Sequence, residues 1–102
     1  DSSENLKKYA LVSVNNLIEY IKTVCLAECS ENDKVKVFEG IVEEEYYKNF
    51  VFYNTDESKI KLFNRKIYKC LKRGYYDKII KYVMIYTKIR GLLGSIKRKI
   101  KI

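Results

Sequence analysis

Residues 56–94 read DESKIKLFNRKIYKCLKRG and then YYDKIIKYVMIYTKIRGLLG, and the rest of the predicted helical fold is organised around this stretch. Asp56 suits an N-cap, because its carboxylate can accept a hydrogen bond from the free N–H groups of a first helical turn. Gly74 suits the position after the last turn, because glycine adopts a positive φ without steric penalty. The stretch therefore predicts one helix between Asp56 and Gly74, followed by a second helix that reaches Arg90.

The first of these helices has two different faces. An apolar stripe at helical spacing predicts core residues at Ile60, Phe63, Ile67 and Leu71. Cations recur at helical spacing on a different face, at Lys61, Arg65, Lys69 and Lys72. Like charges one turn apart cost about a few tenths of a kcal/mol each. Such a row is either a solvated surface or a set of donors for phosphates, and this helix alone favours neither interpretation.

The N-terminal half is also predicted to be helical. Apolar residues recur at helical spacing over residues 5–28, which indicates one long helix or two short ones, and again over residues 35–49. The turn between them, residues 29–33, ends with Asp33 as a predicted N-cap. Aromatic and β-branched residues at 50–54 predict a short extended connector.

Two glycines lie close together near the C-terminus of the chain. Near Arg90, Gly91 and Gly94 permit a tight turn or a close backbone approach, and residues 95–102 form either a short amphipathic end that packs its isoleucines or a frayed basic tail. Helices dominate the chain, so the predicted fold is all-α, a compact single-domain helical bundle over residues 1–102.

Charge is strongly segregated along the chain, which carries 21 Lys and Arg against 13 Asp and Glu. Residues 1–56, the acidic half, contain 6 basic and 11 acidic side chains, whereas residues 57–102, the basic half, contain 15 and 2. This asymmetry indicates a polyanionic partner, with the acidic half repelling it and so orienting the binding face. No apolar run approaches the roughly 20 residues needed to cross a bilayer.

Composition argues against several chemistries. The chain has no His, which removes the usual general base near neutral pH and the commonest zinc ligand. Its three Cys are too few for a four-sulfur metal site. Because three is an odd number, a closed disulfide framework is not expected, and this favours a reducing, cytoplasmic location. Glycine-rich phosphate loops are absent. We therefore expect a non-catalytic binding module without a metal or other cofactor.

One segment resembles a known family. Asn64-Arg65-Lys-Ile-Tyr68-Lys-Cys-Leu-Lys-Arg73-Gly74 is similar to part of the C-terminal domain of the large subunit of archaeal and eukaryotic DNA primase. In that family an Arg, a Tyr three residues later, a basic residue and a helix-closing Gly precede a second helix and an Ile-Arg-x-x-x-Gly motif. Residues 89–94 match that motif as IRGLLG, and the resemblance covers roughly residues 60–95, under half of the chain.

The chain differs from this family at several positions, and these differences indicate which kind of relative it resembles. The family domain holds an iron–sulfur cluster on four Cys, whereas this chain has three and none follows the Ile-Arg-x-x-x-Gly motif. Tyr86 also lies one residue further from Arg90 than the pattern expects. The chain thus resembles a cluster-free relative, the small non-catalytic third subunit of archaeal DNA primase (PriX). The resemblance implies binding of the initiating nucleotide or primer 5′ end against a template while another subunit performs nucleotidyl transfer.

The resemblance also implies partners, and the chemistry of the side chains suggests which residues would contact them. The partners would be the catalytic and large primase subunits, single-stranded DNA template, and a nucleoside triphosphate or primer. Phosphate donors would be Arg65, Lys69, Lys72, Arg73 and Arg90, with Lys61 at the rim. Asn64 would hydrogen-bond a base or sugar edge, and Tyr68 would either stack on a base or, more simply, cover the core. Arg90 has its own structural alternative as a cation at a helix C-terminus.

Two other interpretations stay open. The chain could be a generic basic helical module that binds nucleic acid without preference for a 5′-triphosphate. It could instead be an interaction domain whose basic half docks an acidic protein or a membrane. The membrane version ranks last, since residues 95–102 contain no aromatic anchor, and no membrane partner is expected.

Overall fold

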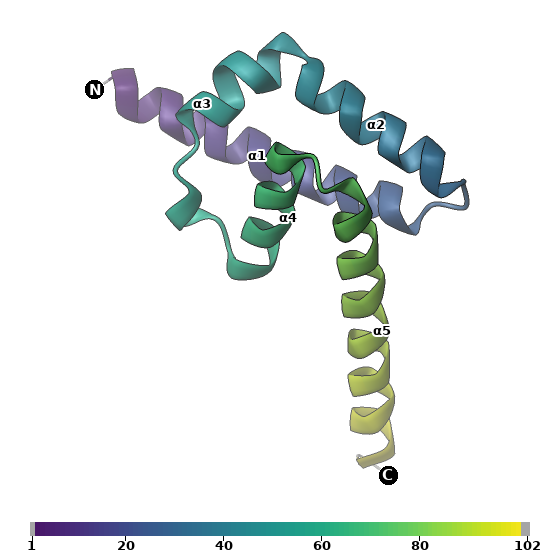
Figure 1. Cartoon of the computed structure of the whole chain (residues 1–102). Helices are drawn as coiled ribbons and strands as arrows, with labels where there is room; N and C mark the ends of the chain where they lie inside the picture. Colours follow the sequence, from purple (N-terminus) through teal and green to yellow (C-terminus); the bar gives the residue numbers. More distant parts are fainter. Residues whose placement is uncertain (1, 101–102) are drawn as a thin grey trace.

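The computed structural model describes residues 2–100, with side chains from Ser2 to Ile96. Every regular element in this range is helical, which confirms the all-α prediction (Figure 1). The elements, in chain order, are α1 (Ser2–Leu26), α2 (Glu31–Glu43), η1 (Tyr46–Val51), α3 (Phe52–Asn54), η2 (Glu57–Lys59), α4 (Leu62–Arg73) and α5 (Tyr76–Ile100). Their buried side chains form one hydrophobic cluster to which α1, α2, α4 and α5 all contribute.

Helix α1 is one continuous helix, as one of the two sequence alternatives proposed. It buries a single stripe at helical spacing, made of Ala10, Val14, Leu17, Ile18, Ile21 and Cys25. Leu6 and Tyr9, two apolar residues in the first turns of α1, are exposed because these turns lie at the edge of the core.

The joint between α1 and α2 differs in detail from the prediction. Ser30, not Asp33, is the N-cap of α2, and its side-chain oxygen accepts a 3.1 Å hydrogen bond from Asp33 N–H. Asp33 thus lies inside the first turn, where its charge favours the helix dipole. The buried Lys34 then donates from Nζ to the Cys25 carbonyl at 2.7 Å, which satisfies a free carbonyl at the end of α1.

The predicted extended connector at residues 50–54 is wrong, because this segment is helical. The chain breaks at Glu44, which has extended backbone angles, and then forms the π-helix η1 and the short α3. Burial of Val51 and ring contacts of Phe50 and Phe52 with neighbouring tyrosines favour the helical turn over the extended backbone that these residue types prefer alone. Between η1 and α4, extended backbone begins after α3, at Thr55.

Helix α4 is stopped as predicted but begins later. Asp56 caps η2, where its carboxylate accepts from Ser58 N–H at 3.0 Å, and α4 begins at Leu62. Gly74 has φ 77° and its N–H bonds back to the last turn of α4. The Tyr75 N–H donates to the Cys70 carbonyl at 2.9 Å, which completes the helix stop. The predicted stripe is buried at Ile60, Ile67 and Leu71, with Phe63 partly buried at its edge.

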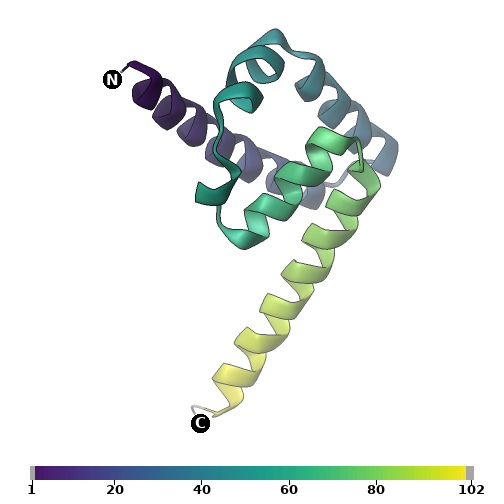
Figure 2. The ribbon, with the colours of Figure 1, turned by 60° about the vertical axis from the view of Figure 1, so that its left-hand side comes forward.

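Helix α5 does not end near Arg90 as predicted but continues without a break through Gly91 and Gly94 to Ile100. Within the described residues only Gly74 takes a positive φ, so the other glycines have ordinary helical geometry. The first turns of α5 pack in the core through Ile79, Ile80 and Val83, whereas its second half projects beyond the other helices in both Figure 1 and Figure 2. This projection explains a radius of gyration of 15.8 Å, against about 13 Å for a spherical chain of this length.

Candidate polyanion-binding surface

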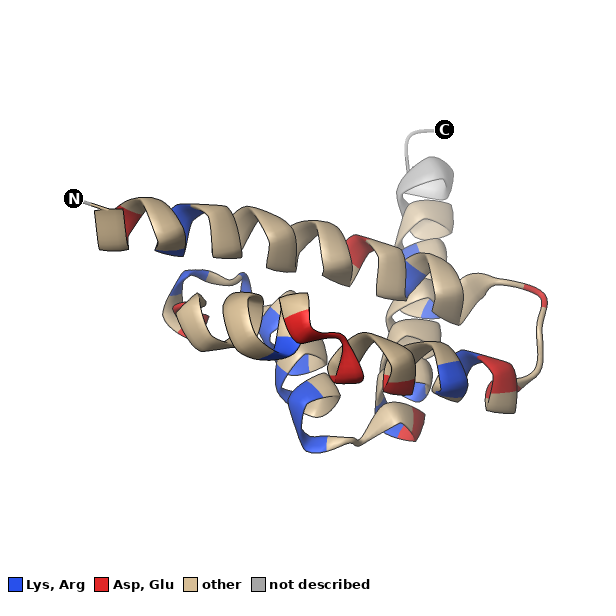
Figure 3. Cartoon of the chain, turned by 90° about the horizontal axis from the view of Figure 1, so that it is seen from above, with Lys and Arg blue, Asp and Glu red and all other residues tan. Residues whose placement is uncertain are grey.

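Acidic and basic side chains occupy different parts of the molecule. Figure 3 shows acidic residues along α2 and the turn after it, whereas α4 and α5 carry mainly basic ones. The segregation in sequence is therefore also a segregation in space. A polyanion is attracted to the α4 and α5 side and repelled from the α2 side.

One hollow, which we call the α4–α5 hollow, gathers several of these cations. Its volume is about 430 Å³ and its lining comprises Leu62, Arg65, Lys66, Lys69, Cys70, Arg73, Tyr75 and Lys78. Lys66, Lys69 and Arg73 share one face of α4 because they lie three, four and seven residues apart. The reversal at Gly74 then brings the start of α5 to the rim. No carboxylate lies in the lining, so nothing there neutralises the cations.

An exposed tyrosine lies beside these cations. Tyr75 is 47% exposed, and Lys78 Nζ lies 4.6 Å from the centroid of its ring. On α4, Lys66 Nζ lies 4.4 Å from the Tyr82 ring centroid. Aromatic faces next to cations are the elements with which proteins bind single-stranded nucleic acid, since bases stack on rings while cations contact the backbone.

Arg65 lines the hollow, but its guanidinium is engaged within the protein. Nη2 donates to the Ser58 carbonyl at 3.0 Å and to the Ile60 carbonyl at 2.9 Å, while Nε is buried without a hydrogen-bond partner. These bonds tie the segment before α4 to the helix. Arg65 therefore has a structural role that the sequence interpretation did not include, and it is not a freely available phosphate donor.

Tyr68 lies in the core and presents no ring face to a base. It is fully buried, as the simpler of the two sequence interpretations held, and Phe52 packs edge-on against it at 5.7 Å. Burial raises the pKa of Tyr68 to about 12, while the nearby Thr55 hydroxyl opposes the rise. Thr55 Oγ1 itself donates to the Val51 carbonyl at 2.6 Å, and the Tyr68 hydroxyl makes no hydrogen bond of ordinary geometry.

Three other predicted contact residues lie outside the α4–α5 hollow. Lys72 pairs with Glu57 at 3.2 Å and covers the Tyr68 ring, so its charge is partly compensated. Asn64 faces α1 in a separate hollow that also contains Lys61. Arg90 lies over the Tyr86 ring at 5.7 Å, in a hollow between α1 and α5. It lies well inside α5, so the interpretation as a helix-terminal cation is wrong.

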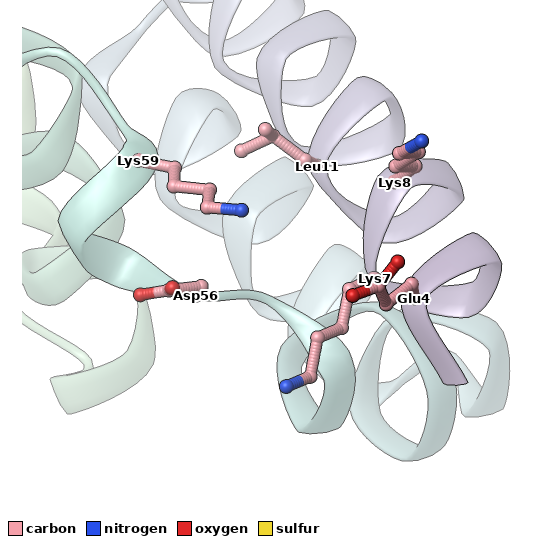
Figure 4. A pocket seen from close by; sticks show the side chains of 6 residues that line it. All are labelled: Glu4, Lys7, Lys8, Leu11, Asp56 and Lys59. Atoms are coloured by element: carbon pink, nitrogen blue, oxygen red, sulfur yellow. The ribbon is translucent and has the colours of Figure 1, made fainter. Parts of the chain in front are cut away.

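A further hollow lies at the start of α1. Figure 4 shows its lining: the lysines Lys7, Lys8 and Lys59, the carboxylates Glu4 and Asp56, and Leu11. Hydrogen bonds from Ser58 hold the pKa of Asp56 below its ordinary value. The mixture of signs leaves little net charge here, so this hollow is a poorer place for a polyanion than the α4–α5 hollow.

In the part of the chain that the structure describes, no cluster of three or more candidate metal ligands is found. The three cysteines there are free thiols, of which Cys25 is buried and Cys29 is exposed. Burial raises the pKa of the Cys25 thiol to about 11, against the opposing charge of Lys34, so that thiol is a poor nucleophile at neutral pH. In residues 2–100, no helix combines the length and apolar character needed to span a bilayer.

The structure thus brings some of the predicted contact residues together at the α4–α5 hollow and places the others elsewhere. Arg65, Lys69 and Arg73 come together, and the sequence analysis missed Lys66, Tyr75 and Lys78 beside them. The position of Lys66, seven residues before Arg73, was a usable signal, whereas the closure of the rim depends on the geometry of the turn at Gly74. Comparisons of the chain with known protein families, characterised proteins and solved structures find no match to any of them.

Proposed function

We propose that the chain is a non-catalytic module that binds single-stranded nucleic acid in the α4–α5 hollow. One observation carries the proposal: cations from two helices surround a hollow that has an exposed tyrosine at its rim and no carboxylate in its lining. Lys66, Lys69, Arg73 and Lys78 would contact backbone phosphates, and Tyr75 would stack on a base.

The location of the hollow supports a nucleic acid over a protein ligand. Its lining contains five Lys or Arg side chains and no carboxylate, and the acidic α2 side of the molecule would repel a polyanion that approached from there. Binding would then be strongly salt-dependent, because each neutralised phosphate releases condensed counterions. For a single strand the slope of log K against log salt is about 0.7 per contact, or about 3 for the four cations.

The more specific form of this proposal is an accessory role in primer synthesis. It rests on the resemblance of residues 64–74 and 89–94 to the primase large-subunit domain. In this form the hollow holds a 5′-triphosphate or primer 5′ end beside the template, and the catalytic and large primase subunits are the partners. A generic single-strand binder is the alternative, and it would show no preference for a 5′-triphosphate.

The test compares two labelled primer–template junctions that differ only in a 5′-triphosphate. Binding of each is measured by fluorescence anisotropy across a salt series, with the parent chain and a Lys69→Ala/Arg73→Ala variant. A Lys36→Ala/Lys48→Ala variant is the matched control, since it removes two exposed cations from α2 and η1.

The expected result is a loss confined to the hollow variant. Its salt slope should fall by about 1.4, two contacts at about 0.7 each, while the control stays near the parent. A triphosphate preference that disappears with Lys69 and Arg73 would support the primase form, and equal binding of both junctions would support the generic form. An equal loss in both variants would mean diffuse attraction, and the α4–α5 hollow would no longer be the binding site.

A further inference from the structure

The second half of α5 carries an apolar stripe that the nucleic-acid proposal does not use. We call it the α5 seam, and it consists of Ile85, Ile89, Leu92 and Ile96, which are 57%, 50%, 64% and 51% exposed. At about 100° per residue these four side chains lie within an arc of about 60°. Their spacing of four, three and four residues is the spacing of a coiled-coil contact line.

The seam lies on the side of α5 that faces away from the core. The buried residues of α5, Ile79, Ile80 and Val83, lie on the opposite side of the helix, and the second half of α5 extends beyond the other helices (Figure 2). A second helix could therefore lie along the seam without a clash with the body. Four large apolar side chains in one exposed line are typical of an interaction surface.

Charge next to the seam restricts what can cover it. Lys81 and Lys88 border one edge, at the positions that flank the contact line of a coiled coil. From residue 78 to residue 102 the sequence contains eight basic and no acidic residues. A second copy of this chain would oppose these cations with the same cations. A nucleic acid offers no apolar surface to the seam, and a bilayer is disfavoured since no aromatic residue follows Tyr86.

We propose that the α5 seam docks an amphipathic helix of a partner protein that carries an Ile or Leu seam flanked by Glu or Asp. Apolar residues of the two helices interlock, and the carboxylates pair with Lys81 and Lys88. The seam is about 18 Å long, for 12 residues at about 1.5 Å each. Such a contact is smaller than a standard protein interface, so micromolar affinity is expected. The inference is independent of the proposed function, since neither Lys81 nor Lys88 lines the α4–α5 hollow.

The test uses three designed helical peptides as probes. The first has a Leu seam flanked by Glu, the second has the same seam flanked by Lys, and the third has an Ala seam flanked by Glu. Binding to the full chain is measured by calorimetry for the parent, an Ile89→Gln/Leu92→Gln variant and a Lys81→Glu/Lys88→Glu variant. The matched control is Leu6→Gln/Val12→Gln, which removes two exposed apolar residues of α1. Circular dichroism verifies that each variant keeps its helices.

The proposal expects the Leu–Glu peptide to bind the parent and the control alike. Ile89→Gln/Leu92→Gln should weaken that binding at least about tenfold. Lys81→Glu/Lys88→Glu should exchange the preference, so that the Leu–Lys peptide binds better.

Four results would overturn the proposal. They are absence of binding, equal binding of the first two peptides to the parent, equal binding of the Ala-seam peptide, and indifference to the Gln substitutions. Sedimentation equilibrium and phosphatidylserine vesicles test the other occupants. A dimer, or vesicle binding, that the Gln substitutions abolish would assign the seam to a second copy or to a membrane surface and would replace the proposal.

Discussion

Replacing Tyr68 with Phe should leave the protein as stable as the parent or more stable. The ring is fully buried, and its hydroxyl has no hydrogen-bond partner, so the substitution removes a desolvated polar group and keeps the shape of the side chain. An unpaired buried hydroxyl costs about 1–3 kcal/mol. Tyr68→Phe should therefore raise the free energy of unfolding by up to about this amount at neutral pH.

The pH dependence gives a second and sharper expectation. The folded state raises the pKa of Tyr68 from 10.0 to about 12, so the neutral phenol is favoured in the folded state. The unfolded state loses its proton first, and stability falls as the pH rises through this window. At pH 11 the parent should have lost about 1.4 kcal/mol through this group alone, whereas below pH 9 it should have lost almost nothing.

Urea unfolding followed by circular dichroism at pH 8, 9.5 and 11 measures both effects. The difference between Tyr68→Phe and the parent should grow toward high pH, while the contribution of the Cys25 thiol, shared by both proteins, cancels. A clear destabilisation at pH 8 would show that the hydroxyl has a partner after all. A parallel loss of stability in the two proteins between pH 9.5 and 11 would refute the argument from burial.

Tyr68→Phe should also leave nucleic-acid binding unchanged, whereas Tyr75→Ala should weaken it.

Other perturbations separate structural roles from binding roles. Gly40→Ala should raise the free energy of unfolding by about 0.5–1 kcal/mol, because a Cβ there meets nothing within 4 Å, whereas Gly74→Ala should lower it by about 1–2 kcal/mol, because φ is 77°. Lys34→Met should lower the free energy of unfolding by about 1.5–3 kcal/mol, since it leaves the Cys25 carbonyl at the end of α1 without its charged donor. Arg65→Ala should lower the free energy of unfolding by a similar amount, since it leaves the Ser58 and Ile60 carbonyls without their charged donor. Lys66→Ala, at a neighbouring exposed position, should change the free energy of unfolding by less than about 0.5 kcal/mol. Urea unfolding measures all five, and an Arg65→Ala variant as stable as the parent would mean that the Arg65 guanidinium is available as a phosphate donor after all.

The sequence was sufficient where local chemistry decides structure. The apolar period of α4 and the glycine stop at Gly74 depend on spacing and on one backbone angle, and both are as predicted. The glycines of α5 show the limit of such reasoning. Gly91 and Gly94 permit a turn but do not require one, and the helix continues because no other residue nearby ends it. The prediction of an extended connector at residues 50–54 is wrong for another reason, since packing on the core overrides the preference of these residues for extended backbone.

The candidate site was predictable only in part because charge pattern does not show the direction of a side chain. Arg65, Lys69 and Lys72 all belong to one predicted cationic face, yet one guanidinium turns inward to two carbonyls and one ammonium pairs with a carboxylate. Only a structure separates cations that are committed to the fold from those that remain available. The exposed Tyr75 was missed for the same reason, because only the turn at Gly74 brings it beside α4.

The two proposed surfaces of α5 should influence each other through charge alone. Lys78 lies at the α4–α5 hollow, and the two lysines that flank the α5 seam, Lys81 and Lys88, are about 4.5 and 15 Å further along the helix at about 1.5 Å per residue. Both proposed ligands are acidic, so each should weaken the other. At about 0.1 M salt the screening length is about 10 Å, so the repulsion should come mainly from the end of the seam near Lys81, while at about 0.01 M salt the length is about 30 Å and the whole seam should contribute. Anisotropy of a labelled single strand, with and without a saturating Leu–Glu peptide, gives this coupling at both salt concentrations. Weakening that grows as the salt concentration falls fits two separate surfaces on one rigid helix, whereas equal competition at both salt concentrations would mean that the two ligands share one site.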